Sequence, residues 1–295
     1  MNNQYKNQSE RQSQLKMINR LSKISILPAF AKLQNWGSIA FVIAITMLML
    51  SSCGKSDVLK IAVEGAYPPF SQTEADGSVT GFDIDIANAL CSEMNVKCEL
   101  VTQEWDGMIP SLIAKKYDAI VASMSITEER LEKVNFTDKY YASTASFAGT
   151  RGAPQLTGDV SDNKSVLKGK RIGVQQATVS DAYITDNYSD VATINRYSKQ
   201  DEIYLDLQAG RIDYVFSDTV PLVDGFLKTP AGADYELLSP GYADEQWFGR
   251  GIGIAIRKGE EDLVAKFNTA IATIRDSGAY DEIQQKYFEF DIYGD

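Results

Sequence analysis

Hydrophobic residues recur at helical spacing in the stretch "FDIDIANALCSEM". Phe82, Ile86, Leu90 and Met94 follow one another every four residues, which predicts an amphipathic helix with Asp83 available as its N-cap. The next segment, "KCELVT", alternates between polar and apolar residues and predicts a strand. A helix followed directly by a strand is typical of an α/β arrangement.

The helix–strand pattern occurs twice in the chain. "DGMIPSLIAKKYDAIVAS" (106–123) aligns without gaps with "DEIYLDLQAGRIDYVFSD" (201–218). Each copy has an Asp cap, a short amphipathic helix, a basic residue and an Asp that opens an apolar strand. A second pair, "LKIAVEGAY" (59–67) and "KRIGVQQAT" (170–178), predicts a strand running into a loop. These repeats predict two α/β lobes of related topology.

The residues that follow the repeated strands are candidates for a ligand site. Ligands of open α/β sheets bind beyond the carboxyl ends of the strands. We therefore expect two groups of residues to face each other across a cleft: 64–67 with 123–125 from the first lobe, and 175–179 with Asp218 from the second.

The C-terminal part of the chain is expected to pack in the core rather than to form a site. Trp247 and Phe248 precede "GRGIGIAI" and are expected in the core where the chain re-enters the first lobe. Apolar residues at helical spacing predict one packing helix from Asp262 to Phe290; they include Leu263, Phe267, Ile271 and Ile274.

The first 52 residues have a different pattern from the rest. They hold six basic residues and one acid, followed by an apolar run at 39–50 that is short for a membrane span and typical of a secretion signal. The run ends in "LSSC", which resembles the lipobox of bacterial lipoproteins and makes Cys53 the candidate lipidation site. Residues 53–57 would form a tether. The alternative is a short membrane helix with an incidental cysteine.

The distribution of charge supports this division. The whole chain carries −11 and residues 1–52 carry +5, so the mature part carries −16. A domain this acidic would repel nucleic acid and anionic lipid, so we expect no nucleic-acid partner and assign membrane attachment to the lipid.

Cys91 and Cys98 are the only cysteines after Cys53. A disulfide between the end of the predicted helix and the next strand is sterically reasonable and agrees with an exported protein. Two buried free thiols remain the alternative.

The chain has no histidine. This excludes the Ser-His-Asp triad, the Cys-His pair and the HExxH zinc site. Neither an acidic or cysteine cluster of metal-ligand type nor a Walker or GxGxxG loop is present, so we expect no metal and no cofactor.

The stretch "ASMSITEER" (122–130) gives the candidate site its chemistry. Ser125 with Glu128 fits a capping box, whose free N–H groups would form an anion seat beside Arg130. Asp218 across the cleft, with the Ser123 carbonyl, could receive an ammonium. A carboxylate receptor facing an ammonium receptor describes an α-amino acid. In the alternative interpretation, Arg130 only pairs with Glu128 or a neighbouring loop.

Four segments together resemble the family-3 bacterial solute-binding proteins. They are "VEGAYPPFS", "GFDIDIANALC", "WDGMIPSLIAKKYDAIVASMSITEER" and "KYFEFDIYGD", and the likeness covers residues 58–295. It is strongest to the lysine/arginine/ornithine- and histidine-binding proteins of amino-acid ABC transporters. The resemblance implies a type II periplasmic-binding-protein fold in the cell envelope, with lobe 1 formed by 58–143 and 247–295 and lobe 2 by 144–246. It also implies a protein that is not an enzyme, expected as a monomer, which delivers an amino acid to a membrane permease.

The resemblance also implies roles for individual residues. The carboxylate-binding residues match Arg130 and Ser125, and the ammonium-binding residues match Asp218 and the carbonyl of Ser123. Glu64 matches an acid at the tip of the ligand side chain. The remaining matches are the flanking aromatics Tyr67 and Trp105 and the loop residues Gln175, Thr178 and Val179.

Several of these positions depart from the family pattern. Val179 replaces a threonine that touches the ligand carboxylate, and Thr178 could make that contact instead. Ala177 replaces a glycine, Trp105 a phenylalanine, and Gln175 an apolar residue.

Because a guanidinium both stacks on aromatic rings and forks onto a carboxylate, we expect arginine first, then lysine or ornithine, then histidine.

Other functions remain open. Glutamine is the main alternative ligand, because an acid at position 64 also suits an amide and Gln175 offers a polar partner. A cyclohexadienyl dehydratase-like enzyme, with Glu64 as its acid, and a sensor that signals to a membrane kinase are further alternatives.

Overall fold

The computed structural model describes residues 58–294. The expected signal (1–52), Cys53 and the tether (53–57) lie outside the described residues, so they stay predictions. Within 58–294, no helix combines the length and the apolar character that crossing a bilayer requires.

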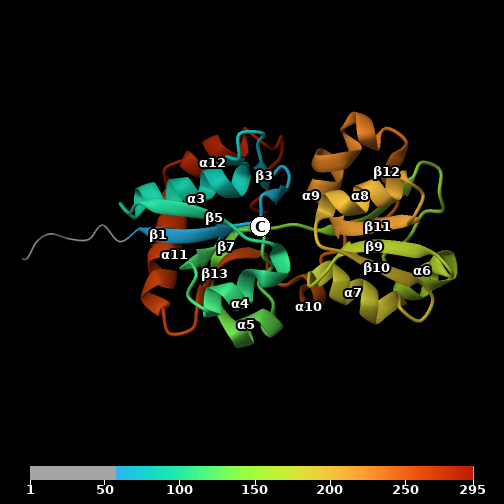
Figure 1. Cartoon of the computed structure of the whole chain (residues 1–295), viewed down its shortest axis with the longest axis horizontal. Coiled ribbons are helices and arrows are strands. Elements are labelled where there is room, and N and C mark those ends of the chain that lie inside the picture. The colour runs from blue at the N-terminus through green and yellow to red at the C-terminus, as the bar shows by residue number, and fades with distance from the viewer. Residues whose placement is uncertain (1–57, 295) are drawn as a thin grey trace, which may run out of the picture. The chain divides into compact units, whose positions relative to one another are not determined.

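The described chain contains two five-stranded sheets (Figure 1). The first has the order β5 (Cys98–Thr102), β1 (Leu59–Val63), β6 (Ala119–Ile120), β13 (Ile252–Arg257) and β7 (Val134–Tyr141). The second has the order β10 (Thr193–Tyr197), β9 (Arg171–Gln175), β11 (Tyr214–Asp218), β8 (Ala145–Thr150) and β12 (Tyr235–Leu237). In each sheet the fourth strand, β13 or β8, is antiparallel to both neighbours, and the others share one direction. We call the two sheets with their helices lobe 1 and lobe 2.

Helices and one small sheet complete the lobes. Lobe 1 has α3 (Phe82–Glu93), η2 (Trp105–Gly107), α4 (Met108–Ile113), α5 (Glu128–Lys133), α11 (Glu261–Asp276), α12 (Ala279–Gln284) and the sheet β2 (Ala66–Tyr67), β3 (Ser71–Thr73), β4 (Val79–Thr80). Lobe 2 has α6 (Val160–Leu167), α7 (Val179–Tyr188), α8 (Gln200–Gln208), α9 (Thr219–Leu222), the π-helical turn η3 (Val223–Leu227), η4 (Pro230–Gly232) and α10 (Glu245–Phe248).

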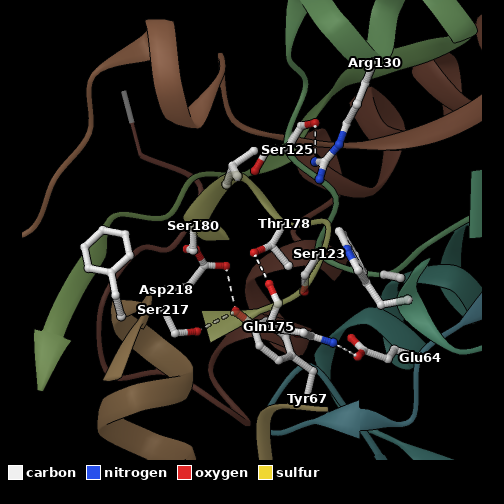
Figure 2. Close-up of a pocket in the computed structure, with 14 residues that line it drawn as sticks. Glu64, Tyr67, Ser123, Ser125, Arg130, Gln175, Thr178, Ser180, Ser217 and Asp218 are labelled. Carbon is white, nitrogen blue, oxygen red and sulfur yellow. Dashed lines mark hydrogen bonds between the residues drawn. The ribbon is translucent and has the colours of Figure 1, made fainter. Parts of the chain in front are cut away.

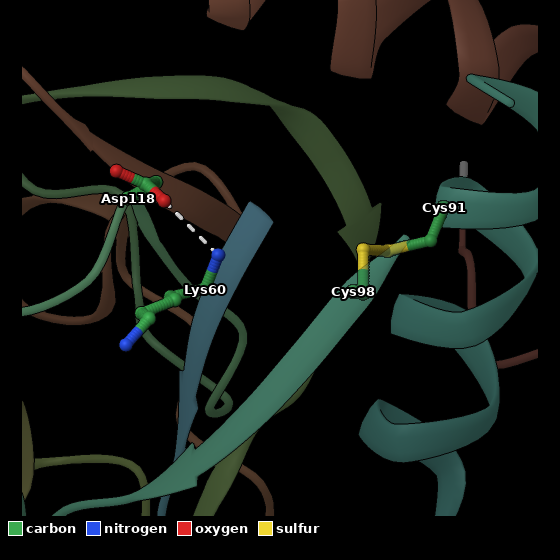
Figure 3. Close-up of a disulfide and its surroundings, with 4 residues drawn as sticks. All are labelled: Lys60, Cys91, Cys98 and Asp118. Carbon is green, nitrogen blue, oxygen red and sulfur yellow. Dashed lines mark hydrogen bonds between the residues drawn. A yellow bond between two sulfur atoms is a disulfide. The ribbon is translucent and has the colours of Figure 1, made fainter. Parts of the chain in front are cut away.

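The predicted internal repeat is confirmed by the strand order. β1 and β9 are each second in their sheets, and β6 and β11 are each third. The repeat extends to single hydrogen bonds: Asp118 accepts from the amide of Lys60 at 3.0 Å (Figure 3), and Asp213 accepts from the amide of Arg171 at 2.9 Å. Each aspartate therefore ties the loop before the third strand to the start of the second.

The predicted Asp caps of the repeated helices are wrong. Asp106 lies within η2, whose N-cap is Glu104, and Asp201 lies in the first turn of α8, whose N-cap is Lys199. Both aspartates stay in the first turn, where a negative charge still favours the helix dipole.

Both faces of each sheet are buried, as the apolar strands require. Along β1, Ile61 and Val63 pack against the cluster that contains α3 and α11, whereas Ala62 joins Met108 and Leu112 on the opposite face. This alternation is the pleat of a strand covered on two sides. The core of each lobe therefore leaves the carboxyl ends of the strands free to build a site.

The chain passes between the lobes twice. It leaves β7 at Tyr141 and enters β8 at Ala145, and it returns to lobe 1 at β13. Trp247 and Phe248 were expected in the core of lobe 1, and this is wrong: Phe248 is buried in the cluster of lobe 2, and Trp247 packs against it. Helix α10 holds both residues against α7 in lobe 2.

The predicted disulfide is confirmed. Cys91 in α3 and Cys98 at the start of β5 are bonded, with their Cα atoms 6.1 Å apart (Figure 3). Asp83, predicted as the N-cap of this helix, is instead a fully buried carboxylate in its first turn, and Gly81 precedes the helix. The expected single C-terminal helix is also wrong, because Gly278 takes a left-handed conformation with φ 82° and separates α11 from α12.

Candidate functional site

A pocket lies where the strand ends of the two lobes meet (Figure 2). It contains about 410 Å³ of space not filled by protein atoms, part of it open to solvent. Its lining residues are Glu64, Tyr67, Trp105, Ala122, Ser123, Ser125, Arg130, Gln175, Thr178, Val179, Ser180, Phe216, Ser217 and Asp218. All ten residues predicted from the sequence line this one pocket.

Four lining residues were missed in the sequence, and each adjoins a predicted one. Ala122 and Ser217 occupy equivalent positions in the repeat, one residue before Ser123 and Asp218. The repeat could therefore have identified this pair. Ser180 follows Val179 at the start of α7, and Phe216 is the middle residue of β11. The side-chain direction of Ser180 depends on where α7 begins and that of Phe216 on the twist of β11, and the sequence pattern gives neither.

Arg130 is buried, with 8% of its surface exposed. Its Nη1 donates to the Ser125 carbonyl at 3.0 Å, and its guanidinium lies 5.3 Å from the centre of the Trp105 ring. In the alternative interpretation, the pairing with Glu128 is wrong, because Glu128 lies 3.6 Å from Arg250 instead. The contact with the Ser125 carbonyl is the neighbouring-loop contact that this interpretation also allowed. Burial lowers the pKa of Arg130 to about 10, so the side chain stays protonated at neutral pH.

The predicted capping box of Ser125 and Glu128 is wrong. Thr127 is the N-cap of α5, and its hydroxyl accepts from the Arg130 amide. Ser125 pairs instead with Ile252 of β13 in an isolated bridge. The N-cap of α5 therefore lies two residues later than the sequence suggests, which leaves Ser125 lining the pocket and α5 carrying Arg130.

Asp218 is the last residue of β11 and faces Tyr67 of lobe 1. Tyr67 Oη donates to Asp218 Oδ2 at 2.8 Å and lies 3.5 Å from Ser217 Oγ (Figure 2). Burial raises the pKa of Asp218 to about 6, although the Tyr67 hydrogen bond and the Arg130 charge act in the opposite direction. A cation placed beside Asp218 would favour its ionised form.

Glu64, directly after β1, meets Gln175 at the end of β9. Gln175 Nε2 donates to Glu64 Oε1 at 2.5 Å and to the Ser198 carbonyl at 3.1 Å. Burial is the main cause that raises the pKa of Glu64 to about 7. In the view of Figure 2, Arg130 lies at one end of the labelled group, and Glu64 with Gln175 lies at the other.

Trp105 of lobe 1 also bonds to the loop before α7 in lobe 2. Trp105 Nε1 donates to the Ala177 carbonyl at 3.0 Å. Ala177, which stands where the family has a glycine, adopts a left-handed φ of 58°, and its amide donates to Asp181 Oδ2 at 3.2 Å. The loop therefore keeps the conformation that glycine would adopt freely, and two hydrogen bonds hold it.

Thr178 and Val179 form the start of α7. The Thr178 hydroxyl donates to the Gln175 carbonyl at 2.7 Å, which holds the loop, and accepts from the Asp181 amide at 3.1 Å, which caps the helix. Val179 and Ser180 are the first two helical residues, and their backbone N–H groups belong to the unpaired first turn of the helix. The loop therefore offers backbone donors to the pocket, whereas the donor of the Thr178 hydroxyl is already used.

Ser123 has a left-handed φ of 53°, which is uncommon outside glycine. Its hydroxyl donates to Asp83 Oδ2 at 3.0 Å, and Tyr140 Oη donates to Asp83 Oδ1 at 2.8 Å. Burial raises the pKa of Asp83 to about 7. Because the hydroxyl is turned toward Asp83 and the amide donates to Tyr140 Oη at 3.3 Å, the carbonyl of Ser123 is the part left to serve the pocket.

The pocket thus presents one guanidinium, two carboxylates and three aromatic rings. Within residues 58–294, no group of three or more His, Cys, Asp or Glu side chains is placed to hold a metal ion. The arrangement can recognise a small molecule that carries both charges, using hydrogen bonds and aromatic contacts.

Two α/β lobes with a polar pocket between their strand ends define the class of type II periplasmic binding proteins. A Salmonella typhimurium periplasmic binding protein of high arginine specificity has this fold, with a TM-score of 0.71, 32% identity, and coverage of 78% of this chain and 99% of that one. Residues 59–290 match the bacterial extracellular solute-binding proteins, family 3, and the chain belongs to that family. It is therefore a solute-binding transport protein and not an enzyme.

Two characterised relatives are similar over most of their length. The L-arginine-binding protein of Pseudomonas aeruginosa is 46% identical over 253 residues, which are 85% of this chain and 96% of that protein. The lysine/arginine/ornithine-binding periplasmic protein of Escherichia coli is 38% identical over 261 residues, 86% of this chain and 98% of that protein.

Proposed function

We propose that this protein binds a cationic α-amino acid, arginine before lysine or ornithine, and delivers it to the permease of an ABC importer. The observation that carries the proposal is the buried Arg130. No carboxylate among residues 58–294 pairs with it in a salt bridge, although burial of an unpaired charge is costly. A ligand carboxylate would supply the missing partner through a bidentate contact.

The other end of the amino acid fits Asp218. The ligand ammonium would take the place of Tyr67 Oη beside the Asp218 carboxylate, with the carbonyl of Ser123 as a second acceptor. Backbone N–H groups at Val179 and Ser180, with Ser125, would add donors for the ligand carboxylate. Because Arg130 and Ser125 belong to lobe 1 and Asp218 belongs to lobe 2, one ligand would bridge both lobes.

The charge balance of the pocket favours a cationic side chain. Glu64 and Asp218 together exceed the single charge of Arg130, so a ligand with a net positive charge improves the balance and a neutral one does not. The side-chain stem would lie between Tyr67 and Trp105, and its tip would meet Glu64. The relatives whose names specify arginine or lysine agree with this assignment.

A thermal-shift screen of ligand-stripped protein with the twenty amino acids and ornithine tests the proposal. A ligand at a hundredfold excess over its dissociation constant adds about 2.7 kcal/mol to the free energy of unfolding. We expect the largest shift with arginine. A shift with glutamine alone would retain amino-acid binding but reject the cationic ligand, and no shift with any of them would reject the proposal.

We also propose that Cys53 is lipidated and holds the two lobes on the outer side of a bacterial membrane. The lobes follow the division expected from the resemblance, except that Trp247 and Phe248 belong with lobe 2. The basic start, the apolar run and "LSSC" support the anchor. The Cys53→Ala protein, purified from cells grown with radioactive palmitate, should carry no label. Persistent labelling of the variant would reject the anchor.

A further inference from the structure

Gln175 is a polar residue with only 4% of its surface exposed at the junction of the two lobes. Its amide nitrogen contacts Glu64 Oε1 and the Ser198 carbonyl, and neither of these atoms donates a hydrogen bond when Glu64 is ionised. The NH₂ group must therefore face them, and both of its hydrogens are used. This assignment follows from the chemistry of the neighbours.

We propose that Gln175 is a positioning residue that orients Glu64 and keeps its carboxylate available as an acceptor for a cationic ligand tip. The inference rests on the proposed function, because it assigns the ligand tip to Glu64. Gln175 reaches Glu64 from the opposite lobe, so this contact forms only where the ends of β1 and β9 meet.

The contact has a consequence for specificity. With Oε1 held by Gln175, the other oxygen of Glu64 is the one left for the ligand. A guanidinium or ammonium needs only acceptors at this place. The amide oxygen of a glutamine ligand would find no donor on Glu64, and the two N–H groups of Gln175 are already used. An unsatisfied buried acceptor weakens binding by roughly five- to 150-fold.

The ionisation of Glu64 depends on the same hydrogen bond. Burial raises the pKa of Glu64, and Asp83 and Asp201 raise it further, whereas the Gln175 hydrogen bond and the Lys199 charge lower it. Removing the Gln175 donor would therefore raise the pKa of Glu64. The carboxylate would then become protonated, and lose its attraction for a cation, at a higher pH than in the wild type.

Gln175→Met tests this role because it keeps the length of the side chain and removes its donors. The matched control is Gln176→Met: Gln176 also bonds a carboxylate of lobe 1, Asp106 Oδ2 at 2.9 Å, but does not line the pocket. Calorimetry from pH 5.5 to 9 gives the ratio of the dissociation constants for glutamine and arginine. Asp218 acts on the ammonium of both ligands, so its titration cancels in the ratio.

We expect the ratio to rise with pH in the wild type through about pH 7, which is the pKa of Glu64, and to level off toward pH 9. In Gln175→Met the rise should move to higher pH, and arginine should bind roughly tenfold more weakly at pH 7. Gln176→Met should keep the wild-type profile. A Gln175→Met profile that coincides with the wild type would overturn the proposal.

A second measurement needs no ligand. Protein labelled with carbon-13 at its glutamate carboxyls is titrated by NMR, and the Glu64 signal is assigned by its loss in Glu64→Gln. The midpoint should lie higher in Gln175→Met than in the wild type, and equal midpoints would reject the role of Gln175. If neither arginine nor glutamine binds, the proposed function fails, while this titration still decides the role of Gln175.

Discussion

Arg130 combines burial with the absence of a salt bridge to any carboxylate among the described residues. Its neighbours are the Ser125 carbonyl and the Trp105 ring, and neither neutralises its charge. By contrast, the exposed Arg250 lies 3.6 Å from Glu128. A buried guanidinium without a salt bridge is best explained by a ligand that brings its own carboxylate.

Arg130→Ala should weaken amino-acid binding by roughly two to three decades, because removing one partner of a buried charge pair costs about 2–5 kcal/mol. Arg130→Lys should recover part of this loss, since it restores the charge without the bidentate fork. Isothermal titration calorimetry measures both. Arg250→Ala is the control and should remain within about twofold of the wild type, as expected for an exposed pair. Wild-type affinity in Arg130→Ala would remove the residue from the site.

At the scale of elements, the lobes also meet beside the pocket rather than only within it. Gly225 in η3 of lobe 2 lies against the carbonyl of Pro68, the residue after Tyr67 in lobe 1. A Cβ at Gly225 would lie 2.7 Å from that oxygen, closer than side-chain carbons approach backbone oxygens. The absence of a side chain at Gly225 therefore allows the two backbones to approach.

Gly225→Ala should weaken arginine binding by roughly five- to 150-fold, the effect of an overpacked contact, without altering any residue that lines the pocket. Gly158→Ala is the control, since nothing lies within 4 Å of its added Cβ. If calorimetry gives equal affinities for Gly225→Ala and Gly158→Ala, the contact does not govern the approach of the lobes.

The strands and most of the pocket residues could be predicted because they depend on short-range patterns, whereas Trp105 was expected only from the resemblance to the family. The repeat placed β1, β6, β9 and β11, and their carboxyl ends carried the candidate residues. The details that failed depend on tertiary contacts. Thr127 caps α5 because Ser125 is drawn into a bridge with Ile252, and Asp83 is buried because Ser123 and Tyr140 reach it from distant segments. The Gln175–Glu64 bond likewise joins residues 111 positions apart.

At the scale of the whole molecule, three buried carboxyl groups in and beside the pocket have pKa values above their ordinary range. Burial raises the pKa values of Glu64 and Asp83 to about 7 and that of Asp218 to about 6. The folded state therefore binds more protons than the unfolded state between about pH 4 and 7. These three groups favour folding at the acid end of that window, and their contribution falls as the pH rises through it.

The unfolding temperature of the ligand-free protein should consequently decrease from pH 5 to pH 8. Arginine should counteract this decrease, because its cationic groups favour the ionised forms of Glu64 and Asp218. The shift in unfolding temperature that arginine produces should thus be larger at pH 8 than at pH 5. Scanning calorimetry with and without arginine measures both trends, and a larger arginine shift at pH 5 would contradict this description of the site.

The most direct measurement is the affinity of ligand-stripped protein for arginine and glutamine, in the wild type and in Glu64→Gln, by isothermal titration calorimetry at pH 8. We predict one arginine per chain in the wild type, bound at least tenfold more tightly than glutamine. In Glu64→Gln the arginine affinity should fall by roughly one to two decades, while glutamine binding should be kept or improved. Tight glutamine binding without measurable arginine binding in the wild type, or an unchanged preference in Glu64→Gln, would contradict the account.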